Sequence, residues 1–260
     1  MKLFVIKIGG NIIDDEKQLA SFLNDFSRIK YPKILIHGGG KIATKISEQL
    51  GIKPQMIDGR RITNADTLQV VQMVYGGLIN KNIVAKLQSK HCNAIGLSGA
   101  DGNIILAKKR TIAKIDYGYV GDVTKIQTNH IHSLFKAGFT PVIAPLTHDG
   151  NGQILNTNAD TMASAIASSL AKKFDVNLIY CFEKSGVLRN MNDEKSLIPK
   201  MNIADYKIYI KEKIISKGMI PKLDNAFEAL KKNVKSVVIC HANELKQVTA
   251  NKKFGTRLEK

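Results

Sequence analysis

The sequence predicts an α/β protein, a three-layer αβα sandwich in which helices cover both faces of a mainly parallel central sheet. Two observations carry this prediction. Short apolar runs rich in β-branched residues alternate along the chain with longer segments whose apolar residues recur at helical spacing. The length of 260 residues suffices for one large α/β domain or for two lobes that share a sheet.

The first part of the chain opens with a buried strand, LFVIKI. A helix, a second strand (KILIH), a second helix and a long third helix follow, and two adjacent glycines weaken the middle of the long helix. These elements are predicted at residues 3–8, 16–29, 33–37, 41–50 and 66–89, with the glycines at 76 and 77.

From residue 93 to about 127 the apolar runs shorten and turn residues become frequent, which predicts hairpins at the edge of the main sheet. The alternation then resumes. The predicted helices are 130–136, 159–171 and 220–232, and the predicted strands are 139–146, 176–182 and 235–240, the last being the final core strand.

No internal repeat, low-complexity tract or long linker interrupts this pattern. A boundary between lobes is therefore expected inside the continuous fold, within the helix at 159–171. We place it near residue 165, which gives one lobe at 1–165 and another at 166–260.

The formal net charge of +17 raises the possibility of a nucleic-acid partner. However, the lysines are scattered along the whole chain, aromatic residues make up only 6%, and the densest basic stretches lack interleaved aromatic residues. We expect a solvated, lysine-rich surface that attracts small anionic substrates, and no nucleic-acid partner. A basic binding module remains the alternative.

The three cysteines, Cys92, Cys181 and Cys240, are odd in number, far apart and set in apolar stretches. This pattern favours buried free thiols in a reducing compartment over a disulfide framework or a zinc site. The apolar run at the N-terminus is broken by Lys7, so neither a signal peptide nor a membrane span is expected. A cytoplasmic location follows as the expectation.

The first candidate for chemistry is Lys7 at the end of the opening strand, followed closely by Gly9, Gly10 and Asn11. Lysine is rarely fully buried without a partner. A lysine against a double glycine, at the carboxyl end of a parallel strand, therefore indicates a position that faces an anion. A lysine that reaches solvent from the sheet edge is the alternative.

The second candidate is HGGGK at 37–41, between a strand and a helix. Three successive glycines let backbone N–H groups approach a phosphate or oxyanion at the N-terminus of the helix. Gly38, Gly40 and Ala43 also fit a dinucleotide-binding pattern, with Asp58 at a suitable distance beyond. A purely structural turn and a nicotinamide-dependent oxidoreductase therefore remain open.

Two further segments place polar side chains in compact patterns. DGRRIT (58–63) contains two adjacent arginines, one of which is a candidate clamp for a substrate carboxylate. LNTNAD (155–160) places Asn156, Asn158 and Asp160 at alternate positions, where they would converge on one side of an extended segment. Helix capping by Asn158 is the alternative.

The last candidate segment is KGMIPK (217–222), which places Lys222 in the first turn of a predicted helix. A cation there opposes the helix dipole, which indicates that an anion offsets it. An exposed lysine is the alternative.

Taken in order, six segments resemble the amino acid kinase family, and within it the branch that phosphorylates N-acetyl-L-glutamate. They are KIGGN, HGGGK, DGRRIT, LSGADG, NTNAD and GMIPK, and they span nearly the whole chain. The resemblance implies the αβα fold of that family, an N-terminal lobe that binds the acyl-amino acid and forms a homodimer, and a C-terminal lobe that binds ATP. The implied reaction, in arginine biosynthesis, gives N-acetyl-L-glutamyl 5-phosphate and ADP.

The resemblance also implies roles for individual residues. Lys7 and Lys222 would act on the transition state, and Asp160 would orient them. The implied substrate-binding residues are Gly39, Gly40, Arg61, Asn156 and Asn158, and the implied ATP-binding residues are Gly9, Gly10, Glu183, Gly186, Lys217, Gly218 and Met219.

The implied chemistry needs no protein base, because a side-chain carboxylate is already ionised at pH 7. Catalysis would consist of aligning two anions and neutralising charge on the transferred group. Lysines, glycine amides and Mg²⁺ can do this. The expected cofactors are ATP and Mg²⁺, with the ion held mainly by phosphates and water.

The chain departs from the family pattern at two positions in the expected ATP site: it has Glu183 where Asp is usual, and Lys217 where a second glycine is common. It also begins at the first strand, without the N-terminal helix of arginine-inhibited hexameric relatives, so we expect a dimer insensitive to arginine. Kinases of N-succinyl-L-glutamate, a carbamate or aspartate remain alternatives.

Overall fold

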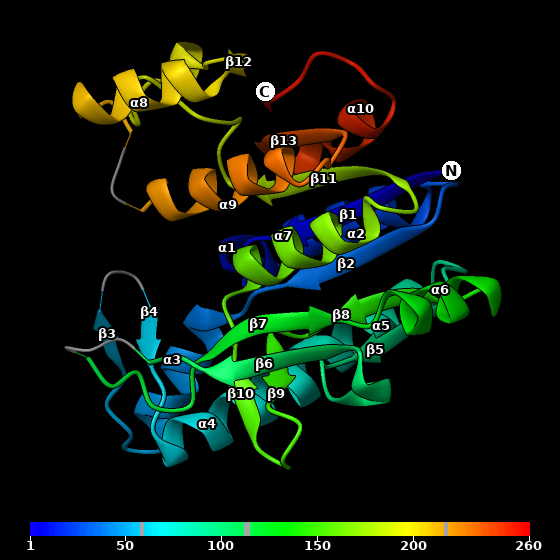
Figure 1. Cartoon of the computed structure of the whole chain (residues 1–260), viewed down its shortest axis with the longest axis vertical. Coiled ribbons are helices and arrows are strands. Elements are labelled where there is room, and N and C mark those ends of the chain that lie inside the picture. Colours follow the sequence, from blue (N-terminus) through cyan, green and yellow to red (C-terminus); the bar gives the residue numbers. More distant parts are fainter. Residues whose placement is uncertain (58–59, 112–114, 216–217) are drawn as a thin grey trace. The chain divides into compact units, whose positions relative to one another are not determined.

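The computed structural model describes residues 1–57, 60–111, 115–215 and 218–260. For Arg60 it describes the backbone alone. The chain divides into two compact units. The first unit consists of residues 1–33 and 163–260, and the second unit consists of residues 34–162. Each contains parallel strands and helices (Figure 1).

The strands of the first unit follow the order β12–β14–β13–β11–β1. They are β1 (Lys2–Ile8), β11 (Asp175–Phe182), β12 (Lys200–Met201), β13 (Ser236–His241) and β14 (Thr256–Leu258). β1, β11 and β13 run parallel, whereas β14 pairs antiparallel with β13. All side chains from 3 to 8 in β1 are buried, as expected for a strand covered on both faces.

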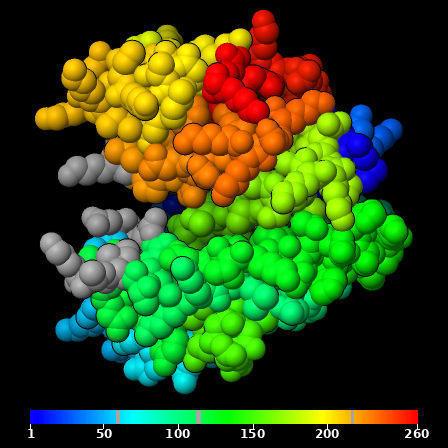
Figure 2. Space-filling view, in the orientation of Figure 1, coloured from blue at the N-terminus to red at the C-terminus, as the bar shows by residue number. Residues whose placement is uncertain are grey.

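The helices of the first unit include α2 and α9, whose apolar faces are buried, and α8, which lies directly against α9 in the space-filling view (Figure 2). Their bounds are α1 (Gly10–Ile13), α2 (Glu16–Ser27), α8 (Ile203–Lys211), α9 (Ile220–Lys231) and α10 (Leu245–Thr249), with short 3-10 helices η3 (Glu194–Ser196) and η4 (Ala242–Glu244). The start of α2 is fixed by Asp15, whose side chain accepts from the backbone N–H groups of Lys17 and Gln18.

The second unit contains the parallel strands β2 (Lys33–His37), β8 (Thr140–Ile143) and β5 (Ala94–Leu97), in that order. A separate sheet follows the order β10 (Ile154–Asn156), β9 (Leu146–His148), β6 (Ile105–Lys109) and β7 (Gly121–Ile126). A short hairpin joins β3 (Gln55–Ile57) to β4 (Arg60–Ile62).

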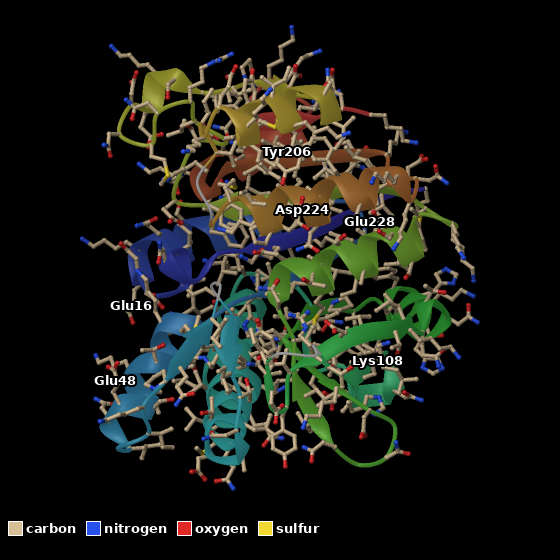
Figure 3. All side chains as sticks on the ribbon, turned by 60° about the vertical axis from the view of Figure 1, so that its left-hand side comes forward. Glu16, Glu48, Lys108, Tyr206, Asp224 and Glu228 are labelled. Atoms are coloured by element: carbon tan, nitrogen blue, oxygen red, sulfur yellow. The ribbon has the colours of Figure 1, made fainter. Side chains whose placement is uncertain are left out.

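Helices in both units carry charged side chains on their outer faces. Glu48 on α3 of the second unit and Glu16 on α2 of the first unit are examples (Figure 3). The bounds of the helices in the second unit are α3 (Gly40–Gln49), α4 (Ala65–Val71), the π-helix η1 (Gln72–Ile79), α5 (Asn80–Gln88), the 3-10 helix η2 (Asp101–Asn103) and α6 (Thr128–Lys136). Helix α7 (Ala159–Leu170) runs from this unit into the first. None of the helices in the described part of the chain is long and apolar enough to cross a membrane.

The predicted fold class is confirmed, and most predicted elements lie within a few residues of the observed ones. The long helix predicted at 66–89 is interrupted by the π-helix η1, which contains Gly76 and Gly77. Glycine has low helix propensity, and a π-helical turn is a common irregularity in such a segment.

Three predictions of secondary structure are wrong in detail. The strand predicted at 139–146 is two strands, β8 and β9, in different sheets, because the chain turns at Ala144 and Pro145. The region 93–127 was predicted as hairpins at the edge of the main sheet. Instead, β5 is a parallel strand, and β6 and β7 pair antiparallel in the separate sheet. The strand at 235–240 is not the last one, since β14 follows it.

The two compact units differ from the lobes predicted at 1–165 and 166–260. The predicted boundary after residue 165 lies within a few residues of the observed boundary after residue 162. However, residues 1–33 belong to the same unit as the C-terminal part of the chain. The reason is strand pairing, since β1 lies parallel to β11 with Ile8 opposite Cys181. The functions assigned to the two lobes stay predictions.

Candidate functional site

The two lysines predicted to act on the transition state meet at one aromatic ring in the first unit. The Nζ atom of Lys7, on β1, lies 4.5 Å from the ring centroid of Phe182, and the Nζ atom of Lys222, on α9, lies 4.1 Å from it. Lys7 is 6% exposed, and Lys222 is half-buried. Two ammonium groups held against one ring concentrate positive charge, which suits an anion such as a phosphoryl group.

The strand register explains why Lys7 reaches this ring. Ile8 lies opposite Cys181, and the N–H of Gly9 donates to the carbonyl of Cys181 at 2.9 Å. A Cβ atom at Gly9 would lie only 3.0 Å from Cδ1 of Phe182, so glycine permits the close approach of the ring. Gly9 therefore contributes space, while its own N–H group is used by the sheet.

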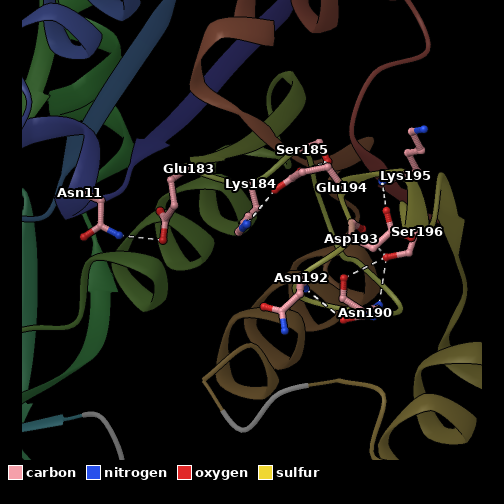
Figure 4. A network of polar contacts seen from close by, with 10 residues as sticks. All are labelled: Asn11, Glu183, Lys184, Ser185, Asn190, Asn192, Asp193, Glu194, Lys195 and Ser196. Atoms are coloured by element: carbon pink, nitrogen blue, oxygen red, sulfur yellow. Dashed lines mark hydrogen bonds and ion pairs between the residues drawn. The ribbon is translucent and has the colours of Figure 1, made fainter.

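A second contact joins the segment after β1 to the segment after β11. Asn11 Nδ2 donates to Oε1 of Glu183 at 2.7 Å (Figure 4). Further along, Glu194 accepts from Lys184 Nζ at 2.7 Å and from Ser185 Oγ at 3.0 Å. These hydrogen bonds lower the pKa of Glu194 and tie the beginning of the loop after β11 to its end.

The same loop borders a small apolar pocket with a cavity volume of about 30 Å³. Two residues predicted to bind ATP, Gly186 and Met219, line it. Aliphatic and thioether side chains with one lysine suit a flat, weakly polar ring that carries an anionic group. The pocket is lined by Lys184, Gly186, Val187, Leu188, Met191, Ile214, Ile215 and Met219.

Gly186 is needed for packing as well as for the pocket, because a Cβ atom there would lie 2.6 Å from Oγ1 of Thr256. Gly218 lies in the turn before α9, and Met219 is the residue that precedes the helix. Lys217 lies outside the described residues. The first turn of α9 contains Lys222. Among the described residues, this turn has no acidic side chain and no side-chain cap.

In the second unit, the glycine turn after β2 leads into α3. Gly39 has φ +145°, and a Cβ atom on it would lie 2.2 Å from Cδ1 of Ile79, so only glycine fits. At Gly40, by contrast, a Cβ atom would meet no described atom within 4 Å. Helix α3 begins there without a side-chain cap among the described residues, so its first N–H groups can bind an anion.

Arg61 lies beside this turn. Its Nη2 atom donates to the carbonyl of Gly40 at 2.9 Å and to Oγ1 of Thr44 at 2.6 Å. Its Nη1 atom is buried and makes no hydrogen bond to any described residue. A guanidinium group that is 8% exposed, with the N–H groups of Nη1 not bonded to any described residue, is well suited to a carboxylate ligand. Burial raises the pKa of the nearby Tyr75, and the charge of Arg61 partly opposes this effect.

The asparagines of the NTNAD segment have different environments. Asn156, at the end of β10, donates from Nδ2 to Oγ1 of the buried Thr63 at 3.0 Å, which links it to the segment that carries Arg61. Asn158 accepts from the backbone N–H of Thr161 at 2.9 Å and caps α7. The capping alternative for Asn158 is therefore observed. Asp160 is 7% exposed and lies in the first turn of α7.

His37, the residue before the glycine turn, is fully buried and hydrogen-bonded through both ring nitrogens. Nδ1 lies 2.8 Å from the carbonyl of Gly38, and Nε2 lies 3.1 Å from Nδ2 of Asn80, which also donates to the carbonyl of Val142. A carbonyl needs a donor and an amide N–H needs an acceptor, so these partners fit a neutral imidazole with its proton on Nδ1. Burial, with a smaller contribution from the charge of Lys81, lowers the pKa of His37 to about 4.

We expect this pKa to make the protein less stable in acid. Below pH 6.5 the unfolded state binds a proton at His37 that the folded state excludes until about pH 4. The free energy of unfolding should therefore fall by about 3 kcal/mol from this group as the pH decreases from 7 to 4. Urea unfolding across this range measures the change.

A His37→Asn variant is the comparison, and its unfolding free energy should depend less steeply on pH between 6.5 and 4. In the unsubstituted protein, the imidazole NMR signal that disappears in His37→Asn should not titrate between pH 8 and 5. A normal titration of that signal would contradict the prediction.

Within the described ranges, no group of three or more His, Cys, Asp and Glu side chains is arranged to hold a metal ion. The three cysteines are free and buried, as the sequence predicts. Cys181 and Cys240 face each other across β11 and β13, with their sulfur atoms 3.9 Å apart.

Phe182 organises the two lysines, although the sequence pattern indicates it only as the end of a strand. Its ring contacts both ammonium groups. A signal was present, because an aromatic residue at the carboxyl end of a parallel strand lies at the edge where ligands bind in α/β folds.

Comparison with known proteins identifies the family of this chain. The model of the amino acid kinase family matches residues 2–241. Acetylglutamate kinase from Cytophaga hutchinsonii is 58% identical over 259 residues, covering 99% of this chain and 98% of that protein, and the enzyme of the same name from Bacteroides fragilis is 53% identical, covering 100% and 97%. Among solved structures, smu.665 from Streptococcus mutans has a TM-score of 0.81 and 28% identity, covering 99% and 98%.

Proposed function

Since this chain belongs to the amino acid kinase family, we propose that it transfers the γ-phosphoryl group of ATP to the side-chain carboxylate of N-acetyl-L-glutamate. The products are N-acetyl-L-glutamyl 5-phosphate and ADP, and the reaction serves arginine biosynthesis. The observation that carries the chemistry is the pair of ammonium groups, from Lys7 and Lys222, at the Phe182 ring. The full-length identity to acetylglutamate kinases supports the substrate.

In this proposal Lys7 and Lys222 neutralise the charge that spreads over the transferred phosphoryl group, and Asp160 orients them. Because both reactants are anions, most of the catalytic effect comes from charge neutralisation and in-line alignment. The buried position of Lys7 strengthens its interaction with the phosphoryl group, since charges interact more strongly away from water.

We assign the two substrates to separate sets of residues. The unused donor of Arg61 supports its role as a clamp for a substrate carboxylate, with Gly39, Gly40 and Asn156 around it. Asn158 is assigned to the same site through its remaining amide donors, because its side-chain oxygen caps α7. The residues proposed for ATP are Gly9, Gly10, Glu183, Gly186, Lys217, Gly218 and Met219.

We propose Mg²⁺ as the metal of the reaction. The described residues include no group of carboxylate, imidazole and thiolate ligands that would hold an ion by themselves, which fits an ion bound chiefly to phosphate oxygens and water. When bound, Mg²⁺ would supply positive charge that offsets the negative charge of the phosphates. The lysines act on the same charge from the protein side.

We propose that the enzyme is a homodimer. The π-helix η1 exposes Met73 (57%) and Leu78 (46%), which lie five residues apart and therefore on the same side of a π-helix. Exposed apolar side chains grouped in this way favour burial against a second copy. Sedimentation velocity should give a dimer, and a hexamer would rule the proposal out.

We propose a cytoplasmic location for the enzyme. Three buried free thiols, two of them 3.9 Å apart and unlinked, are compatible with a reducing compartment. Cell fractionation tests this, and recovery of the protein outside the cytoplasm would contradict it.

The experiment that tests the function is a coupled ADP-release assay with Mg-ATP across N-acetyl-L-glutamate, N-succinyl-L-glutamate, glutamate and aspartate. We expect N-acetyl-L-glutamate to give the highest kcat/KM. Preference for the succinyl compound would keep the reaction and change the acyl group. Absence of turnover with every carboxylate would remove the kinase proposal.

A further inference from the structure

A buried tyrosine outside the residues assigned to the reaction is attached to the helix that carries Lys222. Tyr206 lies on α8 and is 4% exposed. Its ring stacks on Phe227 of α9, with the centroids 5.1 Å apart and an interplanar angle of 29°. Figure 3 shows Tyr206 on α8 next to α9, the helix that carries Asp224 and Glu228. The ring therefore joins the two helices.

The hydroxyl group of Tyr206 contacts the first turns of α9 on both sides of Lys222. It donates to Oδ1 of Asp224 at 2.7 Å, and its oxygen lies 3.3 Å from the carbonyl oxygen of Ile220. Asp224 is two residues after Lys222 and Ile220 is two residues before it. The shorter distance and the negative charge make Asp224 the main acceptor.

The start of α9 needs such a contact. Its N-cap, Met219, provides no side-chain hydrogen bond, and the first turn contains a lysine, which the helix dipole disfavours. Among its described residues, that turn contains no acidic side chain. The hydrogen bond from Tyr206 to Asp224 fixes the turn from a neighbouring helix instead.

The tyrosine keeps its proton and stays a hydrogen-bond donor near neutral pH. Burial, the hydrogen bond to Asp224 and the charge of that carboxylate all raise the pKa of Tyr206. The hydroxyl therefore keeps its proton, and the contact with Asp224 does not depend on pH near neutrality.

We propose that Tyr206 is a positioning residue for phosphoryl transfer: its hydrogen bond to Asp224 holds the first turn of α9 so that the Lys222 ammonium group stays at the Phe182 ring. This inference rests on the proposed function of Lys222. The inference goes beyond the proposed function because it assigns a role to Tyr206, which contacts no reacting atom. Loss of the hydroxyl should let the turn shift, and displacements of about 1 Å can cost up to about 10²-fold in rate.

The first test is Tyr206→Phe, which keeps the ring and its stacking on Phe227 and removes only the hydroxyl. We expect kcat to fall by about 5- to 20-fold, with the KM for N-acetyl-L-glutamate within twofold of the unsubstituted enzyme. Asp224→Ala removes the acceptor, leaves the tyrosine in place, and should lower kcat by a similar factor. The matched control is Glu228→Gln on the same helix, whose carboxylate pairs with Lys231 and Lys232; its kcat should not change.

The decisive measurement is a double-mutant cycle with Lys222→Ala. If Tyr206 acts through Lys222, then Tyr206→Phe should lower kcat in the unsubstituted enzyme but by less than twofold in the Lys222→Ala background. A general structural role would lower kcat by the same factor in both backgrounds, and that result would overturn the inference. An unchanged kcat in Tyr206→Phe would also overturn it.

The same cycle separates this inference from the proposed function. If Lys222→Ala alone keeps near-normal turnover, the catalytic role of Lys222 is wrong, and the positioning role of Tyr206 is wrong with it. If Lys222→Ala loses turnover while Tyr206→Phe and Asp224→Ala keep theirs, only the positioning role fails. Thermal unfolding of each variant identifies any loss of activity that comes from loss of folded protein.

Discussion

Replacing Lys7 with alanine is expected to lower kcat by about 10² to 10³, the range observed when one preorganised electrostatic contact to a transition state is removed. Lys7 is buried on β1 and its ammonium group lies at the Phe182 ring together with that of Lys222. If the lysine acts mainly on the charge that develops during transfer, KM for both substrates should change much less than kcat. Steady-state ADP release measures both constants.

Lys2 provides a matched control for this experiment. It lies on the same strand, and its ammonium group also lies over aromatic rings, 4.7 Å from the centroid of Phe4 and 5.1 Å from that of Tyr31. Lys2→Ala therefore removes a lysine with similar contacts that has no assigned role, and kcat should stay unchanged. Near-normal turnover in Lys7→Ala would show that the assignment of Lys7 is wrong.

The second large effect is expected at Arg61, and it should appear in substrate binding. Hydrogen bonds to charged groups contribute about 1.5–3 kcal/mol, so Arg61→Ala should raise the KM for N-acetyl-L-glutamate by about 10- to 100-fold. Arg61→Lys keeps the positive charge but loses the planar fork that contacts Gly40, Thr44 and the ligand, so it should recover little of this loss. The KM for ATP should remain within twofold.

The role of Arg61 as a carboxylate clamp can be tested separately with a substrate analogue whose α-carboxylate is replaced by a carboxamide. The unsubstituted enzyme should discriminate strongly against the amide. The Arg61→Ala enzyme should discriminate weakly, because the charge that recognises the carboxylate is gone. Arg28→Lys, at an exposed position of the first unit, serves as the control. Equal discrimination by the Arg61→Ala and unsubstituted enzymes would contradict the clamp.

Much of the fold could be predicted because the strands are short apolar runs that only a buried parallel sheet accommodates. The strand at 3–8 and the helix at 220–232 were placed within about one residue of β1 and α9. Helix α8, at 203–211, was missed although Asn202 and Asp205 form a capping box at its start. Its sequence, IADYKIYIK, has apolar residues at alternating positions that obscure the helical period.

The sequence by itself determined the set of chemical groups: two lysines at the ends of a strand and a helix, a glycine turn, an arginine pair and a segment of alternating amides. That glycine is required at Gly39 was decided by the structure, because a backbone with positive φ against Ile79 leaves no room for a side chain. Family membership follows from the same segments, which lie in a fixed order along nearly the whole chain.

Only the tertiary structure decided which of these groups meet. The pairing of β1 with β11, between residues more than 170 positions apart in the chain, brings Lys7 to the ring of Phe182, and packing of α9 brings Lys222 to the same ring. The structure also decided that Asn158 caps a helix and that the buried Nη1 of Arg61 bonds to none of the described residues. The physical reason is that local patterns specify strands and helices, whereas register and burial depend on contacts between distant segments, which no local pattern contains.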